Sequence, residues 1–116
     1  MFATLFGIVI SLNPPQHQVP DGIYDLVMYD TLGYSHSQAV YIGCIGVIPS
    51  QYCMMDQDTG VMFHLEMYSN KLKIWHQFEH DFMCFDGDIK AKGYVEGTYD
   101  SWHNRGYFTM EFKHGR

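Results

Sequence analysis

Two histidines and a glutamate stand at a spacing with which helices can hold a zinc ion. The segment from His76 to His80 reads His-Gln-Phe-Glu-His and matches the H-x-x-E-H pattern. The pattern needs a helix, because residues four apart share a face there. Around it, however, apolar and polar residues alternate, which predicts a strand. On a strand the two histidine backbones would lie about 13 Å apart and Glu79 would face the opposite side. We therefore predict no metal site.

A second chemical pattern is the tripeptide Asp58-Thr59-Gly60, which also occurs in aspartic proteases. There the tripeptide follows an apolar strand and precedes a small residue, whereas Gln57 and Val61 flank it here. No later apolar-Ile-Gly-Arg segment supports it. Asp and Gly are ordinary turn formers, so we interpret residues 56–60 as a polar hairpin loop.

The three cysteines, Cys44, Cys53 and Cys84, have no C-x-x-C spacing. We interpret them as buried, reduced thiols of a cytoplasmic protein. A bridge between Cys44 and Cys53 is the alternative, and it would leave Cys84 unpaired.

Charge and composition exclude several classes of partner. The net charge is −6 and the chain has only 7 Lys and Arg residues, so it lacks the basic surface that binds nucleic acid or anionic membranes. The apolar segment 1–10 is too short to span a bilayer and is predicted to be a first strand. The sequence has no Gly-x-Ser-x-Gly elbow or phosphate-binding glycine loop. We therefore expect no cofactor.

Alternating residues in the second half of the chain predict consecutive hairpins. A two-residue loop at Ser69-Asn70 would join strands 61–68 and 71–82 and pair Glu66 with Lys73 on the outer face. The same register pairs Leu65 with Ile74 on the inner face. A slip of one residue would lose both matches.

Asp86-Gly87 predicts a second hairpin with a type I′ turn, because such turns need positive φ at both central residues. A further strand would then run over 88–99, and a last one over 106–113. The expected pairs across this turn are Cys84 with Ile89, Phe82 with Ala91 and Asp81 with Lys92.

The first half of the chain predicts strands at 24–29 and 39–48 and a short strand at 52–55. Together these elements predict one all-β domain over residues 1–116. Its seven or eight antiparallel strands would form an up-and-down barrel or a strongly twisted sandwich. No segment predicts a helix.

The closing stretch resembles the end of calycin-type small barrels. Residues 93–101 read Gly-Tyr-Val-Glu-Gly-Thr-Tyr-Asp-Ser and residues 106–108 read Gly-Tyr-Phe. In calycins, which include avidin-like and lipocalin-like proteins, a Gly-Thr-aromatic strand pairs with a Gly-x-Phe strand. The resemblance covers about twenty residues and implies a barrel. The Gly-x-Trp expected near the start of a lipocalin is absent, and no ligand contacts carry over.

Aromatic residues make up 16% of the chain and lead to the functional prediction. We expect a non-enzymatic binding protein that uses an aromatic surface or barrel mouth to bind a protein partner, such as a virus- or phage-encoded inhibitor of a host factor. Tyr and Trp are the usual anchors of interfaces, and Trp75 should point outward opposite His64. The expected contacts are Trp75, Tyr94, Trp102 and Tyr107.

The alternative function is a small-molecule carrier with an internal cavity. Inward-facing aromatic and histidine side chains would line that cavity, namely Phe63, His76, Phe78, His80 and Phe108. A hydrolase or metal enzyme is the third hypothesis. The partner, the ligand and the oligomeric state stay open.

Overall fold

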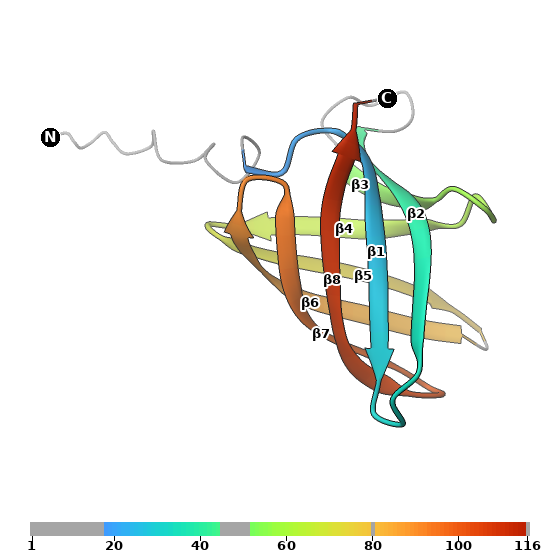
Figure 1. Ribbon diagram of the computed structural model, residues 1–116. Helices are drawn as coiled ribbons and strands as arrows, with labels where there is room; N and C mark the ends of the chain where they lie inside the picture. The colour runs from blue at the N-terminus through green and yellow to red at the C-terminus, as the bar shows by residue number, and fades with distance from the viewer. Residues whose placement is uncertain (1–17, 45–51, 80, 116) are drawn as a thin grey trace, which may run out of the picture.

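The computed structural model describes residues 18–44, 52–79 and 81–115. These residues form a closed antiparallel barrel of eight strands, in which each strand pairs with the next and β8 pairs with β1 (Figure 1). The prediction of an all-β up-and-down barrel is confirmed. The strands are β1 Gly22–Asp30, β2 Ser35–Cys44, β3 Tyr52–Asp56, β4 Met62–Tyr68, β5 Lys71–Phe78, β6 Asp81–Ala91, β7 Tyr94–Ser101 and β8 Arg105–His114.

The first predicted strand, 1–10, lies outside the described residues, as do positions 45–48 of the predicted strand 39–48. The part of that strand that is described begins earlier than expected, at Ser35. Val40, Tyr41 and Ile42 are consecutive and all buried, which agrees with a strand covered on both faces.

The hairpin at Ser69-Asn70 is confirmed in its predicted register. Leu65 pairs with Ile74, Glu66 with Lys73 and Met67 with Leu72. Ser69 adopts a φ of 55°, the left-handed conformation that tight two-residue turns require.

The prediction of a hairpin at Asp86-Gly87 is wrong. These two residues lie inside β6, where Asp86 pairs with Lys73 on one side and with Thr98 on the other. Neither has a positive φ, whereas Gly93 has a φ of 77° and forms the turn between β6 and β7. The predicted strand 88–99 is therefore two strands, and the predicted strand 71–82 ends at Phe78.

Gly87 stands in a strand because its neighbours leave no room for a side chain. A Cβ at this position would lie 2.6 Å from Val95 Cγ1 and 3.0 Å from the Phe108 ring. Its partner on β7 is Gly97, where a Cβ would lie 1.9 Å from the Asp86 carbonyl oxygen. Two facing glycines thus open space in the barrel wall, and the Phe108 side chain fills the interior beside it.

The corrected register changes which residues of β6 face the interior. His76 pairs with Met83 and Ile74 pairs with Phe85, so Asp81, Met83 and Phe85 share the inner face. Phe82 lies on the outer face, opposite Gln77. The pairs predicted for Phe82, Cys84 and Asp81 across an 86–87 turn do not form.

One end of the barrel is filled. Val19 is fully buried within the main core cluster, and residues 18–20 cross the end at which β1 begins (Figure 1). The carbonyl of Gln18 accepts a hydrogen bond from the Gly93 N–H at 2.6 Å. The Tyr24 hydroxyl donates to the Pro20 carbonyl at 2.7 Å. The segment before β1 is thereby joined to the β6–β7 turn and to the barrel interior.

Candidate functional site

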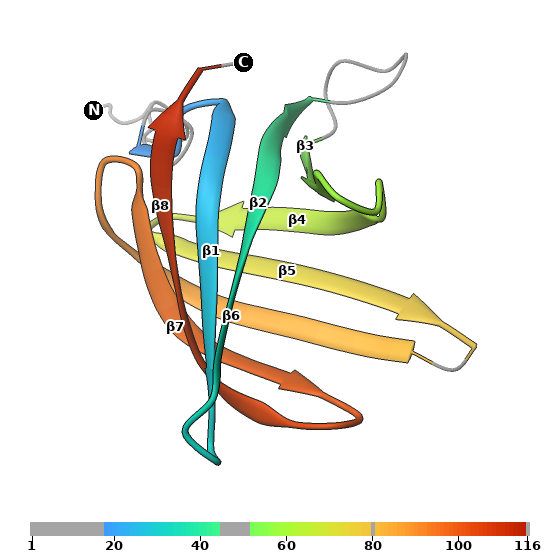
Figure 2. The same ribbon diagram turned by 45° about the vertical axis from the view of Figure 1, so that its right-hand side comes forward.

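The other end of the barrel holds a cavity of about 480 Å³. In an up-and-down barrel alternate connections meet at one end, and the cavity lining includes residues of the β1–β2, β3–β4 and β7–β8 connections together with Asp81 at the start of β6. Figure 2 shows the β1–β2 and β7–β8 connections away from the end at which β1 begins. A volume of this size suits a small organic ligand. The lining residues are Met28, Asp30, Tyr34, Ser35, His36, Gln38, Asp56, Thr59, Val61, Phe63, His76, Asp81, Met83, Tyr99 and Asn104.

The floor of the cavity is apolar and aromatic. Phe63 and His76 come from β4 and β5, and their ring centroids lie 5.1 Å apart. Phe85 and Phe108, which pack edge to face at 5.1 Å, belong to the core cluster and do not line the cavity. The aromatic core therefore ends where the cavity begins.

Apart from buried tyrosines, His76 is the only buried polar or charged side chain among the described residues, with 7% of its surface exposed. It lies on the inner face because β5 alternates and Ile74 points into the core. Its ring therefore offers the cavity a polar group from the floor, whereas the other polar lining groups come from the rim.

Gly106 brings Asp30 and Tyr99 to the same part of the cavity. On β8, Gly106 pairs with Asp30 of β1 on one side and with Tyr99 of β7 on the other. A Cβ at Gly106 would lie 1.9 Å from the Tyr29 carbonyl oxygen, so glycine is needed where these strands approach. No side chain stands between Asp30 and Tyr99. Burial, and then the charge of Asp30, raise the pKa of the Tyr99 phenol.

Two aspartates at the rim also hold the loops in place. Asp56 Oδ1 accepts hydrogen bonds from the N–H groups of Asp58 and Thr59, and its Oδ2 accepts one from Gln38 Nε2 at 2.7 Å. Asp30 Oδ1 accepts from two backbone N–H groups of the β1–β2 loop. The prediction that residues 56–60 form a hairpin loop is confirmed, with Gly60 at a φ of 78°.

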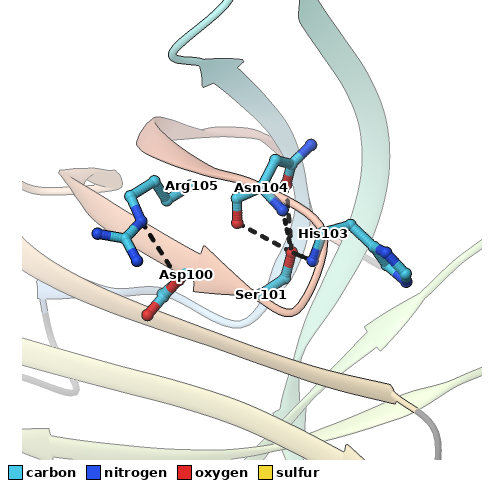
Figure 3. Close-up of polar contacts among 5 residues, drawn as sticks. All are labelled: Asp100, Ser101, His103, Asn104 and Arg105. Carbon is cyan, nitrogen blue, oxygen red and sulfur yellow. Dashed lines mark hydrogen bonds and ion pairs between the residues drawn. The ribbon is translucent and has the colours of Figure 1, made fainter.

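Ser101 organises the loop between β7 and β8. Its hydroxyl donates to the Asn104 carbonyl at 3.0 Å and accepts from the Asn104 N–H at 3.1 Å (Figure 3). The Arg105 guanidinium lies 3.9 Å from the Asp100 carboxylate. These contacts hold Asn104 at the cavity and leave Trp102 in solvent, 55% exposed.

The three cysteines are free thiols, so the alternative of a bridge between Cys44 and Cys53 is wrong. Cys44 is exposed rather than buried, and the other two are half-buried. Burial raises the pKa of Cys53 and of Cys84, and the Asp86 carboxylate raises that of Cys84 further. A raised pKa makes a thiol a weak nucleophile at neutral pH.

No three His, Cys, Asp or Glu side chains in the described parts of the chain converge on a point that could hold a metal ion. His76 points into the barrel, and His80 lies outside the described residues. The distance expected between the two histidines is therefore not tested.

The four predicted partner contacts are spread over the barrel. Trp75 points outward and stacks on His64 with ring centroids 5.3 Å apart, as its position opposite His64 predicted. Tyr107 stacks on Tyr29, and Trp102 lies in the β7–β8 loop. Tyr94 stands at the opposite end of β7 from that loop and donates a hydrogen bond to Glu96. The role predicted for these residues stays a prediction.

Of the five residues predicted to line a cavity, Phe63 and His76 do so. Phe108 is fully buried in the core instead. The Phe78 side chain and the whole of His80 lie outside the described residues. The carrier hypothesis thus placed two of its residues at the observed cavity.

Sequence reasoning missed most of the rim. Asp81 and Met83 were missed because the predicted strand 71–82 continued past Phe78, where β5 ends, and so placed Phe82 instead of Asp81 on the inner face. Three further lining residues, Asp30, His36 and Tyr99, also face the interior. They were missed because an inner face is predicted from apolar residues at alternate positions, and polar inward residues do not give that pattern. Only the pairing of β1 with β8 brings Asp30 and Tyr99 together.

Comparisons with protein-family models, with curated proteins and with solved structures gave no match. Within the described ranges, no helix has the length and apolar character needed to cross a membrane.

Proposed function

We propose that this chain is a non-enzymatic protein that binds a small organic ligand in the open end of its barrel. One observation carries the proposal: a cavity of about 480 Å³ with an apolar floor and a polar rim. Barrels of eight strands have interiors that can hold one small ligand. Pockets of about 300–1,000 Å³ that combine apolar walls with a few polar groups are typical ligand sites.

A test is saturable binding of the neutral dye N-phenyl-1-naphthylamine, followed by its fluorescence. Met83→Trp should fill part of the cavity, since Met83 lines it, and weaken dye binding by at least about tenfold, or about 1.4 kcal/mol. The control is Gln77→Trp, because Gln77 is exposed on the outer face of β5. Equal dye binding by both variants would contradict the proposal.

Native mass spectrometry of the freshly purified protein adds an independent measurement. A retained small mass that Met83→Trp removes supports the carrier function and gives the mass of the ligand. A retained mass that survives in Met83→Trp would place the ligand elsewhere.

The second candidate is a protein partner, favoured by apolar side chains exposed beside the cavity. Leu32 and Tyr34 are 80% and 72% exposed in the β1–β2 loop, and Trp102 is exposed in the β7–β8 loop. The Thr31 N–H donates a hydrogen bond to the Arg105 carbonyl, so these two loops are neighbours. Tyr and Trp are typical interface anchors, and the partner we propose is a host factor that covers the mouth.

The double variant Leu32→Ala with Trp102→Ala tests this second candidate, because both side chains are exposed in the two neighbouring loops. It should lose capture of the partner protein while its far-ultraviolet circular dichroism stays unchanged, and the control is Tyr68→Ala, another exposed aromatic position. Capture that survives the double variant would remove these residues from the interface. Three free thiols also fit a reducing compartment, so we keep a cytoplasmic location within the proposal.

A further inference from the structure

The charges around the cavity have one sign. Three carboxylates line it, from Asp30, Asp56 and Asp81, and no Lys or Arg of the described residues does. Arg105, the first residue of β8, lies beside Asp100 instead. Like charges around one concave space repel one another, and a cation placed among them relieves that repulsion.

Two of the three carboxylates keep oxygens free for a ligand. Asp30 uses only Oδ1 for the backbone N–H groups of its loop, and Asp81 makes no hydrogen bond or ion pair with any described residue. Asp56 differs, because both of its oxygens already accept hydrogen bonds from the protein. A cation would therefore find its partners at Asp30 and Asp81.

A tyrosine hydroxyl in the same space has no protein partner among the described residues. Tyr99 is only 5% exposed and lines the cavity, and its hydroxyl makes no hydrogen bond within the described part of the chain. Since no buried side-chain N or O atom of the described residues lacks a partner, this hydroxyl oxygen is accessible from the cavity and can bind a ligand there. The Tyr99 oxygen can accept from an N–H donor, and its ring, like that of Phe63, can face a cation.

We infer that the cavity binds a protonated organic amine with an apolar body, the ammonium group lying near Asp30, Asp81 and the Tyr99 hydroxyl. This inference rests on the proposed function and names its ligand class. The apolar body would lie against the apolar lining residues Phe63, Val61 and Met83. A bare metal ion fits less well, because no three ligating side chains of the described residues converge there.

Three probes with the same indole body separate charge from shape. Tryptamine carries an ammonium group, tryptophol a neutral hydroxyl and indole-3-acetate a carboxylate. Titration calorimetry at about pH 8, where ordinary imidazoles are neutral, should show tryptamine binding at least about tenfold more tightly than tryptophol, and indole-3-acetate weakest. Added salt should narrow the difference.

Substitutions of Asp30 and Asp81 test whether these two carboxylates cause the preference for tryptamine. Asp30→Asn with Asp81→Asn should bring tryptamine to within about twofold of tryptophol, since charge-assisted hydrogen bonds are about twice as strong as neutral ones. Asn at position 30 retains an acceptor for the loop N–H groups. Asp81→Asn alone, at an exposed position, should lose part of the preference without disturbing the loop. The control Asp58→Asn removes the same charge from an exposed residue outside the lining and should change nothing.

The outcomes separate this inference from the proposed function. Equal binding of tryptamine and tryptophol, or tighter binding of indole-3-acetate, would overturn the amine while leaving a ligand-binding cavity. Preference for tryptamine that survives the double Asp→Asn variant would also overturn the assigned site. The probes should be tested up to about 1 mM, a concentration at which binding with a Kd of about 1 mM or tighter is detected. If none of the three binds, both the inference and the proposed function are overturned.

Discussion

The two ends of this barrel are built from the same kind of strands but are completed in opposite ways. At the closed end Val19 and Tyr24 are fully buried, and the polar groups of Gln18, Pro20 and Gly93 bond with one another or with Tyr24. At the open end the core stops at Phe85 and Phe108, and carboxylates and a hydroxyl face an empty volume. Strand pairing alone thus forms the barrel. The side chains at each end determine whether its interior is a packed core or an open cavity.

The difference also indicates where stability and binding reside. Satisfied hydrogen bonds and packed aromatic rings stabilise the closed half. Carboxylates and an accessible hydroxyl line the open half instead, and local departures from an apolar core are common at functional sites. Substitutions in the closed half should therefore alter unfolding, and substitutions in the open half should alter binding.

The largest expected effect comes from removing one aromatic ring from the packed core and one from the wall of the cavity. Phe108→Ala should lower the free energy of unfolding by about 3–5 kcal/mol, since the ring is fully buried. Phe63→Ala should lower the free energy of unfolding by at least about 1 kcal/mol less than Phe108→Ala does, because the Phe63 ring already faces the cavity. Urea unfolding measures both. Equal costs would show that the open end is packed as tightly as the core, and Phe108→Leu repeats the comparison if Phe108→Ala does not fold.

Removing one tyrosine hydroxyl at each end of the barrel should give a smaller difference in stability than the Phe108 and Phe63 variants. Tyr24→Phe removes a hydroxyl that donates to the Pro20 carbonyl at 2.7 Å and should cost about 1 kcal/mol of stability. Tyr99→Phe removes a hydroxyl without a hydrogen-bond partner among the described residues. It should change the unfolding free energy by less than about 0.5 kcal/mol while weakening tryptamine binding. The reverse order of stabilities would contradict the contrast between the ends.

Alkaline pH should test the closed end through Tyr24. Burial, followed by the charges of Asp21 and Tyr52, raises the Tyr24 pKa above its ordinary value. Below about pH 10, the ordinary tyrosine pKa, both states hold the phenol proton. As the pH rises further, the unfolded chain releases that proton while the native state retains it, so stability falls.

The measurement is the urea midpoint at two pH values, one below and one above the ordinary tyrosine pKa. Tyr24→Phe should reduce the loss of stability between them, and Tyr34→Phe should leave it unchanged because Tyr34 is exposed. A loss that is the same in the wild type and in Tyr24→Phe would show that other groups cause it.

The sequence by itself determined the all-β class, the hairpin loops at Ser69-Asn70 and at residues 56–60, and the outward position of Trp75. Local alternation carries that information, because side chains of a strand point to opposite faces in turn. At Ser69-Asn70 the apolar and charged pairs of two strands agree in only one register, so a short segment was enough to predict it.

Tertiary structure decided the rest, and Gly87 shows why. Asp-Gly is a turn signal when the local chain is considered alone, but this glycine is needed because Val95 and Phe108 occupy the space of its side chain. The same holds for the site. Asp30 and Tyr99 are far apart in the chain and meet only because β8, with Gly106, lies between β1 and β7. Closure of a barrel is a long-range event, and no local pattern of residues encodes which polar side chains it brings to one cavity.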